Sequence, residues 1–129
     1  MVPPATLERP TPVAGGAQVG VLLQFDNGQV IRLARTVVVV GRNPVARESD
    51  AGPQLVALDD PGHSVSKTHF ACGDDERGVW VEDRNSTNGT SVTDRRGRRA
   101  TLTPGRRTRV AVDVTITFGD RHVVLTLDP

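Results

Sequence analysis

Three short polar segments of the chain carry the residue types that bind a phosphate group. They are Gly41-Arg42, Ser66-Lys-Thr-His69, and Asp-Arg-Asn-Ser-Thr-Asn-Gly-Thr over residues 83–90. A phosphate monoester carries about −1.5 to −2 charges at pH 7 and three acceptor oxygens, so its receptor needs a cation and several short donors. Arg42 can donate two parallel charge-assisted hydrogen bonds, while Lys67 supplies an ammonium group. Ser66 and Thr87 add hydroxyl groups, and the three segments together predict an anion-binding site.

In this order, the three segments resemble the forkhead-associated (FHA) domain family. The pattern of that family is Gly-Arg, then Ser-x-x-His, then Asp-x-x-Ser-x-Asn-Gly-Thr, and all three occur here. Each is weak alone, because Gly-Arg and Asn-Gly-Thr are common by chance, but three in register are specific. The resemblance covers residues 19–129 and implies an all-β, eleven-stranded, two-sheet β-sandwich of the SMAD/FHA type. It also implies that loops at one end of the sandwich recognise phosphothreonine in a peptide.

The resemblance assigns roles to individual residues. It implies that the phosphopeptide is bound by Arg42, Ser66, Lys67, Thr87 and Asn88, of which Asn88 bonds the peptide backbone. The residues expected to structure the loops are Gly41, His69, Asp83, Ser86 and Gly89. Among these, His69 is expected to brace the two binding loops and Gly89 to adopt a positive φ. Asp83 and Ser86 are interpreted as turn-forming residues with Asx-type hydrogen bonds.

An enzyme and a metal site are the competing interpretations of the same polar residues. A hydrolase triad would use Ser66, His69 and Asp83, but the chain has no Gly-x-Ser-x-Gly motif. If residues 66–69 are extended, Ser66 and His69 also point to opposite faces. A metal site would need His69 to converge with residues from separate strands, namely His63, Cys72 and His122, at spacings that match no zinc module. We therefore expect no catalysis, no metal and no cofactor.

Seven arginines over residues 95–109 are the feature that favours nucleic acid. No aromatic residue lies among them to stack on a base, and the whole chain has three Phe and one Trp. The 16 basic and 15 acidic residues leave a net charge of +1, which argues against a nonspecific polyanion binder. We interpret these arginines as the solvated face of a β-hairpin, with an electrostatic docking surface as the alternative, and expect no nucleic-acid partner.

The elements that must position these residues are predicted to be strands. The 20 Val, 13 Thr and 2 Ile make 35 of 129 residues β-branched, which suits pleated strands. The 13 Gly and 9 Pro interrupt the chain too often for long helices. Asn27-Gly28 predicts a hairpin turn, and the apolar run 36–41 predicts a strand buried on both faces. The strands expected from apolar runs between turns cover residues 21–25, 30–33, 36–41, 55–58, 69–72, 79–82, 90–92, 99–102, 109–112, 114–118 and 122–127.

The ends of the chain and its cellular role give broader expectations. Residues 1–18, with four prolines, are expected to form a flexible tail or linker, and residues 19–129 the folded domain. No apolar run is long enough to enter a membrane, and we expect a cytoplasmic module or the cytoplasmic domain of a larger, membrane-attached protein. The arginine-rich composition favours a bacterial source, where an upstream Ser/Thr kinase would phosphorylate the partner.

Two further hypotheses stay open at this point. One is that the domain is a phospho-independent scaffold, or a regulatory part of a larger protein. The other is that a phosphorylated Thr6 or Thr11 in the tail occupies the domain's own site.

Overall fold

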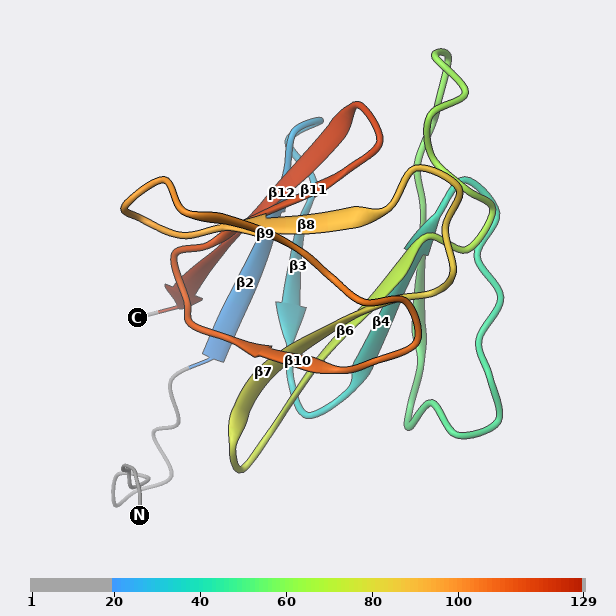
Figure 1. The fold of residues 1–129 in the computed structure, drawn as a ribbon. Helices are drawn as coiled ribbons and strands as arrows, with labels where there is room; N and C mark the ends of the chain where they lie inside the picture. Colours follow the sequence, from blue (N-terminus) through green and yellow to red (C-terminus); the bar gives the residue numbers. More distant parts are fainter. Residues whose placement is uncertain (1–19, 129) are drawn as a thin grey trace.

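The chain folds into two stacked β-sheets whose strands are mostly antiparallel (Figure 1). The structure is a computed structural model, and it describes residues 20–128. No helix occurs within this range, and it therefore contains no helix able to span a membrane. The expected tail over residues 1–18 lies outside the described residues, and so do Thr6 and Thr11. The prediction of a two-sheet, all-β sandwich is confirmed.

Eleven strands in the described range build the two sheets. In spatial order, the five-stranded sheet contains β10 (Thr108–Val110), β7 (Gly78–Asp83), β6 (Phe70–Asp75), β4 (Val37–Gly41) and β5 (Gln54–Ala57). The six-stranded sheet contains β3 (Val30–Leu33), β2 (Gly20–Phe25), β12 (Arg121–Asp128), β11 (Thr115–Phe118), β8 (Thr90–Thr93) and β9 (Arg99–Thr101). All neighbouring strands are antiparallel except β4 and β5, which are parallel.

The core lies between the two sheets. It is made of every second residue along the strands, namely those whose side chains face the other sheet. Leu23, Ile116 and Leu125 of the six-stranded sheet are fully buried there, and Val38 and Phe70 of the other sheet pack in the same cluster. Burying each such side chain contributes about 1.5–3 kcal/mol, so this cluster is the main source of stability.

Strand β4 is buried on both faces, as its apolar run predicts. Val38 and Val40 face the main core, whereas Val37 and Val39 join a second cluster with Ala71 and Trp80 on the outer side of the sheet. Ala46, in the loop that follows β4, packs against this second cluster. The loop after β4 therefore covers the outer face of its own sheet.

The turn between β2 and β3 confirms the predicted Asn-Gly hairpin. The N–H of Phe25 donates to the carbonyl of Gln29 at 2.8 Å, and Gly28 adopts a φ of 90°. This left-handed conformation favours glycine because it lacks a Cβ.

The pairing of three strands brings the polar loops to one end of the sandwich. Val40 near the end of β4 is opposite Phe70 at the start of β6, and Phe70 is opposite Asp83 at the end of β7. The loop after β4, the segment before β6 and the loop after β7 must therefore lie next to one another. In Figure 1 these loops gather on the right, whereas the two ends of the described chain lie on the left.

Candidate functional site

The segments after β4 and before β6 are joined by backbone hydrogen bonds that continue the sheet beyond the two strands. The N–H of Arg42 donates to the carbonyl of Ser66 at 3.2 Å, and the N–H of Asn43 donates to the carbonyl of Lys67 at 3.0 Å. The two predicted cations, Arg42 and Lys67, are exposed on these paired segments. Their backbones are therefore fixed while their side chains face solvent.

Gly41 permits this close approach. A Cβ on Gly41 would overlap the carbonyl oxygen of Lys67 and lie 3.0 Å from that of Ser66. These obstacles are backbone atoms that hydrogen bonds hold in place, so a side chain could not be accommodated by a rotamer change. Packing therefore requires a glycine immediately before Arg42.

The guanidinium of Arg42 is oriented by one hydrogen bond. Its Nε donates to the carbonyl of Val65 at 3.2 Å. Among the described residues, no hydrogen bond or ion pair engages the two terminal amino groups of Arg42. A guanidinium held in this way presents donors suited to a tetrahedral oxyanion.

Two hydrogen bonds join the loop after β7 to the segment before β6. The Oγ of Ser66 accepts from the N–H of Thr87 at 2.9 Å, and the Nδ2 of Asn88 donates to the carbonyl of Ser64 at 2.9 Å. A serine hydroxyl that accepts one hydrogen bond still has its own hydrogen to donate. Ser66 and Thr87, predicted from separate segments, are thus brought together, and Asn88 links the loops through Ser64, which the sequence analysis did not identify.

His69 is fully buried and uses both ring nitrogens within the protein. Its Nδ1 accepts from the N–H of Ser66 at 3.0 Å, and its Nε2 lies 2.8 Å from the carbonyl oxygen of Gly89. A backbone N–H can only donate and a carbonyl can only accept, so the hydrogen is assigned to Nε2. Burial lowers the pKa of His69, which favours this neutral ring.

This arrangement corrects one step of the sequence analysis. The argument that Ser66 and His69 point to opposite faces required an extended segment, and residues 64–69 precede β6 and are not part of a strand. The catalytic triad is nevertheless not formed in this arrangement. The His69 nitrogens are occupied by backbone groups, and the carboxylate of Asp83 is satisfied elsewhere.

Asp83 organises the turn that follows β7. Its Oδ1 accepts from the hydroxyls of Ser86 at 2.5 Å and Thr90 at 2.6 Å, and its Oδ2 accepts from the N–H of Ser86 at 3.1 Å. The last of these is the expected Asx-type hydrogen bond. Gly89 has a φ of 80°, as predicted. The fully buried carboxylate is therefore paired with neutral donors, and Thr90 joins the loop-forming residues.

A buried ion cluster of Asp50, Glu82 and Arg84 lies next to the binding loops, and no local sequence pattern predicts it. The guanidinium of Arg84 makes two hydrogen bonds to Asp50, at 2.8 and 3.1 Å, and donates to Glu82 at 2.7 Å. The Arg84 side chain is only 3% exposed, and Arg84 lowers the pKa of Asp50 through these hydrogen bonds. Because Asp50 also accepts from the N–H of Arg47, the cluster ties the loop after β4 to the end of β7.

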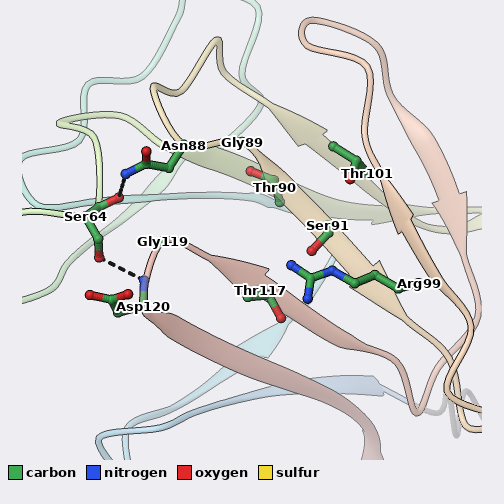
Figure 2. Close-up of a pocket in the computed structure, with 10 residues that line it drawn as sticks. All are labelled: Ser64, Asn88, Gly89, Thr90, Ser91, Arg99, Thr101, Thr117, Gly119 and Asp120. Atoms are coloured by element: carbon green, nitrogen blue, oxygen red, sulfur yellow. Dashed lines mark hydrogen bonds between the residues drawn. The ribbon is translucent and has the colours of Figure 1, made fainter.

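A pocket of about 330 Å³ adjoins these loops (Figure 2). Of the five residues predicted to bind the phosphopeptide, only Asn88 lines it. Its other walls are formed by Ser64, by Gly89, by residues of β8, β9 and β11, and by the turn after β11. The pocket is therefore a neighbour of the predicted phosphate site and not the site itself.

The competing sites of the sequence analysis are not assembled in the described range. Residues 20–128 hold no group of three or more His, Cys, Asp or Glu side chains that could bind a metal. The seven arginines do not share one hairpin: β9 pairs with β8 in one sheet, whereas β10 pairs with β7 in the other. The expected arginine-faced hairpin is therefore wrong for three of the seven residues. Arg95, Arg96, Arg98 and Arg99 lie in the β8–β9 hairpin, whereas Arg106, Arg107 and Arg109 lie in or just before β10, at the edge of the other sheet.

The fold and the loops define a class of protein: a β-sandwich that presents oriented hydrogen-bond donors and two exposed cations at one end. A model of the FHA domain family matches residues 38–119. The chain belongs to the FHA domain family. No curated protein sequence gives a significant match.

Solved structures agree with this assignment. One solved structure is described as a structural and functional analysis of phosphothreonine-dependent FHA domain interactions. This chain is 26% identical to it, and the match covers 85% of this chain and 98% of that one with a TM-score of 0.59. It is also 26% identical to the FhaA FHA domain complexed with the intracellular domain of Rv3910, covering 81% and 98%, with a TM-score of 0.58. The MEK1 FHA domain in complex with a HOP1 phosphothreonine peptide is 22% identical over 84% of this chain and 97% of that one, with a TM-score of 0.60, and shares the fold.

Proposed function

We propose that this domain is a non-catalytic module that binds phosphothreonine in a partner protein. The observation that carries the proposal is that Ser66 is hydrogen-bonded to both other segments: its carbonyl accepts from the N–H of Arg42 and its Oγ accepts from the N–H of Thr87. Donors from three segments meet there at one end of the sandwich. The FHA domain described as phosphothreonine-dependent, at 26% identity, supports the same ligand.

Within this proposal each site residue has a distinct task. Arg42 and Lys67 supply the positive charge, and the hydroxyls of Ser66 and Thr87 donate to phosphate oxygens. Asn88 aligns the peptide, exchanging its hydrogen bond to the Ser64 carbonyl for bonds to the peptide backbone. The partner is a protein phosphorylated by a Ser/Thr kinase in the cytoplasm of a bacterium, and residues 19–129 form the functional unit.

The remaining predicted residues keep the donors in place. Gly41 allows the close approach of the first two segments, and His69 connects the second segment to Gly89. Asp83 and Ser86 shape the turn that carries Thr87. No bond is made or broken in the ligand, because neither a free base nor an activated nucleophile is part of this arrangement.

The test is calorimetric titration with a degenerate phosphothreonine peptide library, followed by the matched threonine and phosphoserine peptides. We expect binding only to phosphorylated peptide, and a loss of about tenfold to hundredfold in Arg42→Ala, since a hydrogen bond to a charged group contributes about 1.5–3 kcal/mol. Arg32→Ala, an exposed arginine of β3 that pairs with Asp128, is the control and should bind normally. Equal binding by Arg42→Ala, or partner binding that survives phosphatase treatment, would instead support a phospho-independent scaffold.

A further inference from the structure

The outer face of the six-stranded sheet carries a row of hydroxyl groups beside the binding loops. Ser91 of β8 pairs with Thr101 of β9 on one side and with Thr117 of β11 on the other. Directly opposed residues in a sheet share a face, and here that face is the outer one, because Ile116 and Phe118, which alternate with Thr117, are buried in the core. These three hydroxyl-bearing residues form the floor of the pocket in Figure 2.

Ser91 is a buried polar residue that lacks a partner. It is only 4% exposed, and among the described residues its Oγ is the one buried side-chain N or O atom with no hydrogen bond. Leaving such a group unpaired is costly, and native structures have few of them. A hydroxyl in this position can be satisfied by a ligand that enters the pocket.

Arg99 brings a positive charge to the same space. It lies on β9 opposite Thr93, one step along the same sheet face from the Ser91 row. Figure 2 shows its guanidinium pointing back over the pocket toward Ser91 and Thr117. Within the described residues, its side chain makes neither a hydrogen bond nor an ion pair. Its donors therefore remain available to a ligand.

The two ends of the pocket differ in charge. Asp120 lines the end next to the loops, where its N–H donates to the Ser64 Oγ at 2.8 Å. Its carboxylate repels an anion at that end, so an anionic group is expected to bind at the end formed by Ser91 and Arg99. There the available groups are the guanidinium and three hydroxyls, all of which can donate to an oxyanion.

We infer that the end of the pocket formed by Ser91 and Arg99 binds a second anionic group of the phosphopeptide, with Arg99 as its specificity-determining residue. The inference rests on the proposed phosphothreonine function. The group that the pocket would bind is an oxyanion that lies close to the phosphothreonine in the partner sequence. A glutamate or aspartate side chain can supply it, and so can a second phosphate.

The distance between the two subsites suits a single peptide. Ser91 is four residues from Thr87 along the chain, so their Cα atoms are at most about 14 Å apart, the span of about four extended residues. Asn88 and Gly89, which line the near end of the pocket, connect the two positions. A peptide anchored by its phosphothreonine can therefore place a residue within about four positions of it in the pocket.

The test compares phosphothreonine peptides that differ at one position. A single glutamate is moved through the four positions on each side of the phosphothreonine in an alanine-rich background, and each affinity is measured by fluorescence anisotropy. We expect one position to raise affinity by about fivefold to tenfold, between the values typical of exposed and buried charge pairs. A second phosphothreonine at that position distinguishes the two sources of the anion, since a phosphate-specific pocket would favour it over glutamate.

Two charge-matched variants assign the effect to the pocket. Arg99→Gln should abolish the glutamate-dependent gain while leaving binding of the all-alanine phosphopeptide unchanged. Arg98→Gln removes the same charge from the adjacent exposed residue, which does not line the pocket, and should retain the gain. In NMR titrations, only the acidic peptide should shift the amide signals of Ser91 and Thr117.

The possible results separate this inference from the function on which it rests. The inference is wrong if every glutamate position binds like alanine, or if Arg99→Gln keeps the gain, although phosphothreonine binding itself would stand. If no phosphorylated peptide binds the wild-type domain, both proposals are wrong. A gain that disappears equally in Arg98→Gln would indicate a general charge effect and would also overturn the assignment to Arg99.

Discussion

The Nε2 of His69 lies 2.8 Å from the carbonyl oxygen of Gly89, in a loop that begins 15 residues later in the chain. Together with the hydrogen bond from the Ser66 N–H to Nδ1, this contact makes one imidazole the bridge between the two binding loops. The bridge needs a neutral ring, because a protonated Nδ1 could not accept from Ser66. The loop arrangement is therefore sensitive to pH.

The free energy of unfolding should decrease as the pH falls from 7 to 5. Burial lowers the pKa of His69 in the folded domain below the ordinary value of 6.5, so the unfolded chain takes up a proton first. Well above pH 6.5 the ring is neutral in both states and contributes no pH dependence. Urea denaturation at a series of pH values measures the effect.

Matched histidine variants isolate the contribution of His69. His69→Asn should lose the slope between pH 7 and 5, whereas His63→Asn and His122→Asn, which replace exposed histidines, should keep it. Burial raises the pKa of Asp74 and would give the opposite slope at lower pH. An NMR titration that showed the His69 ring protonating at or above pH 6.5 in the folded domain would contradict this explanation.

Gly41→Ala should weaken phosphopeptide binding by tenfold or more, because the new Cβ would displace Lys67 and with it the segment that carries Ser66. Gly28→Ala is the control. Gly28 has a positive φ, which Gly41 does not, and a Cβ there meets nothing within 4 Å. We expect Gly28→Ala to cost about 1 kcal/mol of stability and to bind normally. If both variants bind equally well, packing does not explain Gly41.

Arg84→Met should destabilise the domain by about 3–5 kcal/mol, because it leaves the buried carboxylates of Asp50 and Glu82 without their cation. Arg109→Met removes another bidentate arginine pair, with Asp75, but that pair is exposed and should cost less than about 1 kcal/mol. Chemical denaturation of both variants measures the difference. Similar losses in the two would show that burial does not set the importance of the Arg84 cluster.

Most of the fold could be predicted from local sequence patterns. Residues 37–40 are four consecutive valines, and such a run is stable only where both faces are covered, as β4 is. Alternation over residues 122–127 likewise predicts that Val123, Leu125 and Leu127 face the core. Val123 and Leu125 are buried there, whereas Leu127 is 51% exposed, so the prediction is wrong for Leu127. The parallel pairing of β4 and β5 could not be anticipated in this way, because it depends on the path of the intervening loop.

The parts of the site that could not be predicted depend on contacts between residues that are far apart in the sequence. Asp50 and Arg84 are separated by 34 residues, and nothing in the local sequence of either indicates a buried ion pair. Ser64 was missed because its carbonyl, which any residue could supply, is the group that Asn88 contacts. Period-two alternation says nothing about the relative directions of Ser66 and His69, because residues 64–69 are not a strand.

Gly20 at the start of β2 is paired with Asp128 at the end of β12, so the first and last described residues of the domain lie side by side. Both points lie away from the loops that carry Arg42 and Thr87 (Figure 1). The two points at which the described domain joins further polypeptide therefore lie on the side of the sandwich opposite to the loops. The same geometry makes the domain suited to insertion as a self-contained unit between other domains, or to circular permutation by a short linker from Asp128 to Gly20.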